Sequence, residues 1–459
     1  MSIPGLGQNV SVTALSTPSP EAVPVVHEIQ ANSEWRFDIA VDKIIQVRIL
    51  SGTAEIFGTE IALNHIYKFQ GIKSSIFTWH GCRIEVKGEC EEYTAEETPM
   101  IQYANTHFAL EMLREKAEKK NVDGPRVLVV GPSNAGKTSL IKILTAYAIR
   151  MGRQPMIINT DSREGLLSIP GTMTAVPFAS IIDVEQGWGS SSTSTPSPVP
   201  AKLPLCYFYG LESPEENTKI YKPVLTRLAL AATSRMADDT DVNISGMIID
   251  TPGVISQGKG GYDLISHLVS EFSVNIILVL GSERLHSEMH RRFSSLKTSS
   301  GDSIALVKLD KSGGCVDRDE EYLKQSRESS IKEYFFGGLN STLSPHTLQI
   351  NFDEISIYKI KGVNSLSFMP GGEEMLDQEL YEKIEPNPSM LHCILAVMYA
   401  SGADPPETIR DASVMGFVYV SEVNQKKKKL KVLAPMNTRI NERPLIWGNW
   451  PEPTMSIIS

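Results

Sequence analysis

A ten-residue stretch, GPSNAGKTSL at 131–140, constrains the fold of this chain more than any other. It has Gly131, Gly136, Lys137 and Thr138 in the spacing Gly-x4-Gly-Lys-Ser/Thr of a phosphate-binding loop. RVLVV before it is short and β-branched, as in a buried parallel strand, and LIKILTAYAIR after it has helical apolar spacing. In such a loop the backbone N–H groups surround phosphate oxygens, the lysine reaches the outer phosphates, and the threonine hydroxyl holds Mg²⁺. The sequence therefore predicts a nucleotide-binding domain.

The region after this loop alternates strand and helix patterns, which indicates an α/β fold with a doubly wound, mostly parallel sheet. Further strands are predicted at Pro155–Asn159, Ser245–Asp250, Asn275–Leu280 and Ser303–Leu309. Helices are predicted at Asn105–Lys120, with Ala109, Leu110, Met112, Leu113 and Ala117 on one apolar side, at Lys222–Met236 and at Gly261–Phe272. Residues 189–204 are rich in Ser, Thr and Pro, which favours a flexible surface insertion. We expect this P-loop domain to cover residues 105–335.

The regions on either side of this domain have different sequence patterns. Residues 1–25 are rich in Ser, Thr, Pro and Gly and are expected to form a flexible tail. Residues 26–104 contain short alternating segments separated by Gly, Asn and Asp, which predicts a small all-β sandwich. Residues 336–459 contain strand patterns with one predicted helix, Ser389–Ser401, and are expected to form a mostly β, α+β domain.

The composition excludes several classes of function. At 459 residues the chain needs more than one core, and its formal charge of −10 argues against a surface that attracts nucleic acid as a whole. The five cysteines lack Cys-x-x-Cys spacing, which indicates a reducing compartment and no zinc site. No apolar run has membrane-spanning length and no signal-peptide pattern is present, so we expect a cytosolic or nuclear protein. The basic run Lys426–Lys429 is either a nuclear import patch or a solvated hairpin turn between two strands.

Two acids follow predicted strands beside the phosphate loop. Asp161 is a candidate base that accepts a proton from an attacking hydroxyl, a candidate Mg²⁺ ligand through water, or a residue that caps the next turn. Asp250, in DTPG, follows the apolar run Met247–Ile249 and stands where a Mg²⁺-holding acid is expected. In the same motif, Gly253 can place an N–H near the outer phosphate.

Three arginines, Arg284, Arg291 and Arg292, follow the predicted strand at 275–280. They either lie over the phosphates and stabilise charge during phosphoryl transfer, with Arg284 as the catalytic candidate, or form the solvated basic face of an amphipathic helix. VKLDKSGG further on is similar to the base-reading loop of GTPases, but Val307 stands where those loops carry Asn or Thr. A GTPase-type switch is therefore the least supported hypothesis for the function of this chain.

Several stretches in order along residues 34–435 resemble the Clp-one family of pre-mRNA cleavage factor subunits, relatives of the P-loop polynucleotide 5′-hydroxyl kinases. They are SGTAEIFGTEI with HIYKFQ, GPSNAGKTSL, SIPGTMTA, SERL, KSGG, IKEYFFG, GFVYVSEVN and LKVLAP. The resemblance implies three domains and a bound ATP with Mg²⁺. It implies that Glu34 contacts the adenine side and that Lys73 approaches from the same domain. The loop residues expected to contact ATP are Ser133, Asn134, Ala135, Gly136, Lys137, Thr138 and Ser139, and the expected metal site is Thr138, Asp161 and Asp250.

The family has a kinase branch and a fungal branch whose members serve in the cleavage factor and bind a Pcf-eleven-type subunit. Active kinases carry Asp-x-x-Gln-Gly where this chain has Glu164 before Gly165, and Asp where it has Gly281. A carboxylate in place of an amide removes a donor and adds repulsion near polyphosphate. The resemblance thus implies a nuclear, ATP-binding scaffold subunit of a cleavage factor IA-type complex, with weak or no kinase activity and indirect or weak RNA contact. The alternative is an active RNA 5′-hydroxyl kinase with Asp161 as its base.

Overall fold

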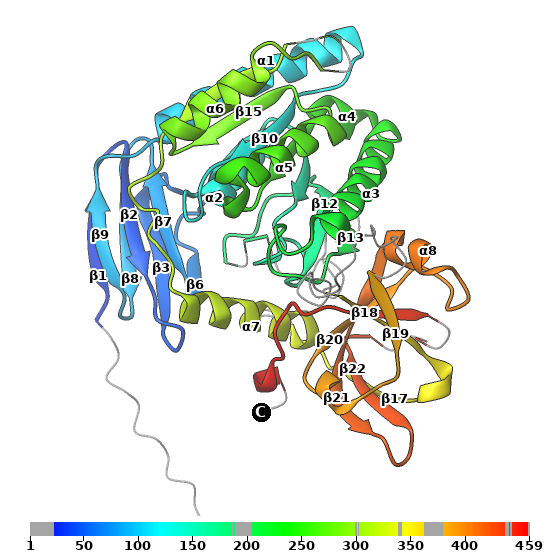
Figure 1. The fold of residues 1–459 in the computed structure, drawn as a ribbon. Helices are drawn as coiled ribbons and strands as arrows, with labels where there is room; N and C mark the ends of the chain where they lie inside the picture. Colours follow the sequence, from blue (N-terminus) through cyan, green and yellow to red (C-terminus); the bar gives the residue numbers. More distant parts are fainter. Residues whose placement is uncertain are drawn as a thin grey trace, which may run out of the picture.

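The computed structural model describes residues 23–185, 187–188, 204–298, 301, 303–337, 342–361, 380–436, 440 and 443–457 (Figure 1). Residues 1–22 and 189–203, where the sequence predicts a tail and an insertion, lie outside these. The described chain forms an N-terminal pair of β-sheets, a central α/β layer and a C-terminal sheet. No helix in these ranges is long and apolar enough to cross a membrane.

The N-terminal part is an antiparallel sandwich, as the alternating sequence predicts. One sheet has the order β1-β8-β3-β6 and the other β5-β4-β7-β2-β9. Ile45, Val47 and Ile49 of β3 point inward while their neighbours are half-exposed, so period-two alternation fills the core between the sheets. The strands are β1 (Val25–Ile29), β2 (Ser33–Asp38), β3 (Ile44–Gly52), β4 (Glu55–Ile56), β5 (Thr59–Glu60), β6 (Ile66–Gln70), β7 (Lys73–Thr78), β8 (Cys82–Lys87) and β9 (Glu91–Ala95).

The central sheet has the order β13-β12-β11-β14-β10-β15-β16. The five strands from β11 to β16 in this order are parallel. At the edge, β12 pairs antiparallel with β11, and β13 pairs antiparallel with β12. This confirms a doubly wound, mostly parallel sheet, although β12 and β13 were not predicted. The strands are β10 (Arg126–Val130), β11 (Met156–Asn159), β12 (Thr172–Pro177), β13 (Leu205–Phe208), β14 (Met247–Asp250), β15 (Ile276–Leu280) and β16 (Ala305–Leu309).

Helices cover both faces of this sheet. Val127 and Val129 of β10 point toward α1 and α2, whereas Leu128 and Val130 point toward α3 and α5, because successive strand residues face opposite sides. Helix α7 runs from beside the N-terminal strands to the C-terminal sheet (Figure 1). The helices are α1 (Met100–Lys120), α2 (Lys137–Arg150), α3 (Thr218–Ala237), α4 (Thr240–Ser245), η1 (Gly253–Ser256), α5 (Gly258–Glu271), α6 (Glu283–Phe293) and α7 (Glu320–Phe336).

Helix α1 exists as predicted but turns a different side to the core. Of the predicted apolar face only Leu110 and Ala117 are buried, while Met112 is 72% exposed. The buried side instead carries Arg114, which is 1% exposed and donates from Nε to the Ser245 carbonyl at 2.9 Å. Glu111 and His107 are buried beside it. A polar network anchors this helix, so the apolar pattern in the sequence pointed to the wrong side. The large apolar side chains left exposed are Ile101, Phe108, Met112 and Leu113.

The C-terminal part is one sheet with the order β17-β22-β21-β20-β23-β18-β19. One face has its own core, and the other packs on the central domain, where the Phe417 N–H donates to the Tyr334 hydroxyl at 3.1 Å. The strands are β17 (His346–Asn351), β18 (Ser356–Ile360), β19 (Tyr381–Ile384), β20 (Ile394–Met398), β21 (Val414–Asn424), β22 (Lys429–Ala434) and β23 (Pro444–Trp447), with short helices η2 (Phe352–Glu354), η5 (Pro388–Met390), α8 (Pro406–Asp411) and η6 (Met455–Ile457).

The predicted helix Ser389–Ser401 is wrong. Residues of this segment form η5 and then β20, a central strand paired with both β21 and β23. All five residues of β20 are buried, so the strand reads as a continuous apolar run, which periodicity cannot distinguish from a buried helix. The expected hairpin around Lys426–Lys429 is confirmed, since Asn424 pairs with Lys429 across the turn.

Candidate nucleotide site

The phosphate loop lines a cavity of about 1970 Å³ between the N-terminal sandwich, the central sheet and the segment 312–337. Its walls come from stretches far apart in the chain. The N-terminal strands lie at one side of the central domain, and α7 lies below it in the view of Figure 1. Nearly all of the predicted site residues meet here. They are Glu34, Lys73, Ser133, Asn134, Ala135, Gly136, Lys137, Thr138, Ser139, Asp161 and Asp250.

The loop has the backbone of a tight anion-binding turn. Asn134 and Gly136 have φ values of 56° and 87°, in the left-handed region that brings successive N–H groups to one side. Gly136 is also closely covered, since a Cβ built there would lie 2.5 Å from the Cys315 sulfur. The Gly131 N–H donates to the Ser256 hydroxyl at 3.1 Å, which fixes the start of the loop to η1. The loop therefore tolerates no side chain at 136.

Lys137 begins α2 and is buried, with 8% of its surface exposed. Its Nζ donates to the Pro132 carbonyl at 3.0 Å, so the side chain folds back over the loop. Burial lowers the pKa of Lys137, while Asp250 and Asp161 favour its charged form. A buried ammonium with one backbone acceptor has donors left for phosphate oxygens.

Thr138 and Asp250 lie at the position expected for a magnesium ion. The Thr138 hydroxyl donates to Asp250 Oδ2 at 2.6 Å, while buried Asp250 Oδ1 has no hydrogen-bond partner among the described residues. Burial raises the Asp250 pKa to about 6. No cluster of three or more acidic, His or Cys side chains that fits a metal occurs in the described ranges. One carboxylate and one hydroxyl suit Mg²⁺ that takes its other ligands from phosphates and water.

Asp161 follows β11 at the same edge of the sheet. Its Oδ1 accepts the Arg163 N–H at 3.0 Å, and its own N–H donates to Asn159 Oδ1 at 3.0 Å. Burial, then the charge of Glu164, raises the Asp161 pKa. The side chain therefore caps the following turn and also lines the cavity, so both of its sequence-based interpretations are compatible with its position.

The N-terminal sandwich contributes a rigid carboxylate. Glu34 is 5% exposed; its Oε2 accepts the Arg36 Nε–H at 2.9 Å and its Oε1 accepts the Thr98 hydroxyl. Arg36 in turn reaches the Glu97 carbonyl at 3.2 Å and packs against Gly314, where a Cβ would lie 2.8 Å from its Nε. The contact with Gly314 closes this end of the cavity and joins the N-terminal sheet to the segment after β16.

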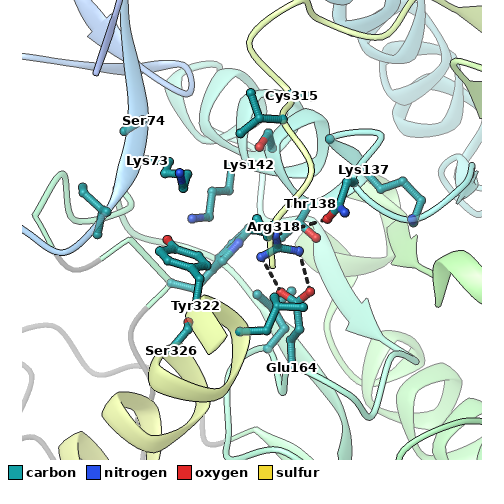
Figure 2. Close-up of a pocket in the computed structure, with 18 of the residues that line it drawn as sticks. Lys73, Ser74, Lys137, Thr138, Lys142, Glu164, Cys315, Arg318, Tyr322 and Ser326 are labelled. Carbon is teal, nitrogen blue, oxygen red and sulfur yellow. Dashed lines mark hydrogen bonds and ion pairs between the residues drawn. The ribbon is translucent and has the colours of Figure 1, made fainter. Parts of the chain in front are cut away.

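Lys73 and Lys142 enter from opposite walls (Figure 2). Lys73 forms an ion pair with Asp38 and lies 5.5 Å from the centre of the Tyr322 ring. Lys142, on α2, lies 5.5 Å from the Phe57 ring centre, and burial lowers its pKa to about 8. Lys142 was not predicted from the sequence, because a lysine within a helix has no distinguishing motif.

Arg318 is the main site residue that the sequence did not reveal. Its Nη1 donates to Glu164 Oε2 at 2.9 Å and its Nη2 to Oε1, a two-point pair drawn in Figure 2. Its Nε donates to Asn134 Oδ1 on the phosphate loop at 3.2 Å. Glu164 is thus neutralised by a guanidinium, so the simple repulsion expected from this carboxylate does not hold. The only signal nearby in the sequence was KSGG, several residues earlier.

The α6 arginines lie elsewhere. Arg284 is exposed and is absent from the described cavity lining, and Arg291 and Arg292 both pair with Glu288 on the same helix. Arg292 also pairs with Asp263 at 3.0 Å. The structure therefore brings none of the three to the phosphate loop.

Charge is unevenly distributed on the cavity wall. Among the described residues, thirteen carboxylates and seven lysines or arginines line it, and this excess of acids disfavours a long polyanion. The lining acids include Glu320 and Glu333 of α7, and Glu216, which stands just before α3. Arg163 offsets Glu320 at 2.7 Å, but Glu216 and Glu333 have no ion pair among the described residues.

A phosphate loop between a parallel strand and a helix, with an acid at the end of the neighbouring strand, defines a P-loop nucleotide-binding protein. Comparison with known families is more specific. Residues 28–117 match the family described as N-terminal beta-sandwich domain of polyadenylation factor, 131–337 match mRNA cleavage and polyadenylation factor CLP1 P-loop, and 343–452 match Pre-mRNA cleavage complex II protein Clp1. The chain belongs to the Clp1 family of mRNA cleavage and polyadenylation factors, as the sequence motifs predicted.

Fungal relatives match over the whole length. The chain is 68% identical over 460 residues to the mRNA cleavage and polyadenylation factor clp1 of Botryotinia fuckeliana. It is 44% identical over 469 residues to the mRNA cleavage and polyadenylation factor CLP1 of Phaeosphaeria nodorum. Each alignment covers 100% of this chain and 100% of the relative. A solved wild-type Clp1p–Pcf11p complex matches with a TM-score of 0.83 at 29% identity, covering 94% of this chain and 98% of that one. A second, described as showing an extended Pcf11p–Clp1p interface and the basis for ATP loss in a glycine-to-arginine mutant, also has a TM-score of 0.83, with 29% identity and 94% and 99% coverage.

Proposed function

We propose that this protein is a nuclear scaffold subunit of the pre-mRNA 3′-end cleavage and polyadenylation machinery that holds ATP·Mg²⁺ as a structural ligand. The observation that carries this proposal is that the site is lined by separate parts of the chain, which the nucleotide would hold together. Glu34 and Arg36 come from the sandwich, Lys137 from the phosphate loop, and Arg318 from the segment that closes over it. A ligand that contacts three separate parts stabilises their arrangement by mass action.

The residues present fit both the nucleotide and the metal. Loop residues 133–139 would hold the phosphates, Thr138 and Asp250 the Mg²⁺, with Asp161 acting through water, and Glu34 the adenine side. Mg²⁺ would neutralise phosphate charge. Asp250 Oδ1, which has no hydrogen-bond partner among the described residues, would be available as its ligand. The ion pair Lys73–Asp38 lines the cavity on the side of the sandwich.

Kinase activity is the alternative, with Asp161 as base; Arg284, the charge-stabilising candidate from the sequence, does not line the cavity. Phosphoryl transfer needs cations that follow the γ-phosphate to the transition state. The one arginine beside the loop, among the described residues, has its three nitrogens engaged by Glu164 and Asn134. The cavity lining also includes Glu216 and Glu333, which have no ion pair among the described residues, and their charge would oppose the approach of a polyanionic second substrate. Both features favour a bound nucleotide that is not turned over.

The partner we propose is a Pcf11-type subunit, as in the solved Clp1p–Pcf11p complexes of similar fold. A scaffold needs exposed contact surface, and α1 presents an apolar stripe of Ile101, Phe108, Met112 and Leu113. These four residues are exposed and do not line the nucleotide cavity, so partner contact there would not require nucleotide release. We assign this stripe to the Pcf11-type subunit.

Two measurements test the proposed function. Protein purified without added nucleotide is expected to release ATP on acid denaturation, close to one per chain. Recovery of empty protein or of GDP would contradict the structural role of ATP. The same preparation, incubated with γ-labelled ATP and a 5′-hydroxyl RNA or DNA, is expected to transfer no detectable label. Robust transfer that Lys137→Ala abolishes would make the kinase alternative the right one.

A further inference from the structure

The C-terminal sheet carries a concentrated basic patch at the turn between β21 and β22. Lys426, Lys427 and Lys428 form the exposed turn, and Lys429 and Lys431 follow on β22. None of these five lysines has an ion pair among the described residues. The chain as a whole carries a formal charge of −10, so this hairpin concentrates positive charge on an otherwise acidic protein, although Glu422, Asp353 and Glu354 lie near it.

The hairpin holds these lysines in a fixed arrangement. The Lys427 N–H donates to Asn424 Oδ1 at 3.0 Å, and the Lys428 carbonyl accepts the Phe352 N–H at 3.1 Å, which ties the turn to the end of β17. Lys428 has φ 47°, a region that Gly or Asn enters more readily than a long side chain. The turn therefore keeps a lysine at a backbone position that glycine or asparagine adopts more easily.

Beside the turn, neutral polar side chains line a hollow of about 420 Å³ with the lysines. Strand pairing sets them in rows, since Lys431 lies between Gln349 and Glu422, and Lys429 lies between Asn351 and Asn424. Amides and ammonium groups in rows suit phosphates and ribose hydroxyls. Glu422 is the one carboxylate of the hollow, which is lined by Thr347, Gln349, Glu422, Asn424, Lys427, Lys429 and Lys431.

We propose that this β21–β22 patch is a single-stranded RNA binding site that contacts the phosphodiester backbone of the transcript. The lining contains no aromatic side chain, so bases have nothing to stack on and binding is independent of sequence. The hairpin lies at the end of the C-terminal sheet remote from the phosphate-loop domain (Figure 1), so the site is separate from the nucleotide cavity. The assignment does not depend on whether ATP is structural.

Two other ligands for a basic run are less compatible with this geometry. A receptor that reads a linear basic signal needs an extended segment, whereas backbone hydrogen bonds hold Lys427 and Lys428 in a turn. An acidic peptide would find cations but no apolar pocket among the residues of the hollow. Both remain as outcomes of the test.

The test measures binding of the full-length, nucleotide-loaded protein to a fluorescently labelled, unstructured 30-nucleotide RNA at several KCl concentrations. Each backbone contact to single-stranded RNA contributes about 0.7 to the slope of log affinity against log salt. Three to five lysine contacts therefore give a slope of about −2 to −3.5, which weakens binding by about 20- to 130-fold between 50 and 200 mM KCl.

The variant Lys427→Gln/Lys429→Gln/Lys431→Gln is expected to bind at least about tenfold more weakly at 50 mM KCl, with the slope reduced by about 2. Replacing the same lysines by arginine should preserve binding.

The matched control removes three exposed lysines at the end of α1, Lys116→Gln/Lys119→Gln/Lys120→Gln, and should stay within about twofold of wild type. Retained ATP and an unchanged melting temperature show that each variant is folded. Equal affinity and slope for the hairpin variant and wild type, or no RNA binding by wild type, would overturn the proposal. Loss of nuclear import or of poly-glutamate binding without loss of RNA binding would reassign the patch to a protein ligand.

Discussion

The ion pair between Glu164 and Arg318 should slow the release of ATP. Glu164 follows β11 and Arg318 belongs to the segment that covers the phosphate loop, so their two hydrogen bonds join opposite walls of the cavity. Their side chains are 46% and 31% exposed, which places the pair near the upper end of the range for exposed ion pairs, about 1 kcal/mol. Glu164→Gln keeps one acceptor oxygen but removes the charge. Since 1.4 kcal/mol is tenfold, we expect ATP to dissociate about fivefold faster.

An opposing effect makes this experiment decisive. Any repulsion of phosphate by Glu164 that remains after its pairing with Arg318 acts in the other direction, so Glu164→Gln would slow release if that repulsion outweighed the closing contact. Glu212→Gln provides the control, because Glu212 lines the same cavity and pairs with Arg163 at 3.0 Å without touching Arg318. Protein loaded with labelled ATP is diluted into unlabelled ATP and the retained label is followed over time. Release from Glu164→Gln that is unchanged, or slower than wild type, would refute the reasoning.

Three further outcomes follow from the same site and surface. Lys137→Ala/Thr138→Ala should lose the nucleotide and with it roughly 3–4 kcal/mol of stability, seen as a lower melting temperature; unchanged stability without ATP would show that ATP is not structural. The Asp250 pKa of about 6 lies above its unfolded value, so metal-stripped protein should lose stability as pH rises from 4 to 6. The stabilisation by Mg·ATP should instead grow from pH 5 to 7, and this pH dependence should flatten in Asp250→Asn. Met112→Glu, at an exposed position, should weaken capture of a Pcf11-type subunit without ATP loss, whereas Lys116→Glu should not; equal capture would exclude the α1 stripe.

The sequence predicts best where local pattern and chemistry coincide. The phosphate loop, β10 and α2 follow from one motif with the correct flanks, and strand alternation identifies the N-terminal sandwich. The acids Asp161 and Asp250 could be placed in the cavity because parallel strands end at the same edge of a sheet. In these cases each residue is adjacent in sequence to the element that positions it.

Prediction fails where a partner from elsewhere in the chain decides the outcome. β20 reads as a helix because both of its faces are covered, and only its neighbours β21 and β23 make it a strand. The buried side of α1 is set by Arg114 reaching the Ser245 carbonyl, 131 positions away. Arg318 reaches Glu164 across 154 positions from a loop without a motif. No local periodicity carries information about contacts of this kind.

The distribution of charge separates two surfaces that are often combined in nucleic-acid enzymes. A kinase must bring a polyanion to the γ-phosphate, yet here carboxylates outnumber cations around the nucleotide, and the nearest arginine is already paired with Glu164. A run of lysines without ion pairs among the described residues lies instead on the C-terminal hairpin, at Lys426–Lys429 and Lys431. RNA attracted to the hairpin is therefore held away from the phosphates of ATP. Such a separation suits a protein in which the nucleotide fixes the arrangement of domains and the transcript is bound without being modified.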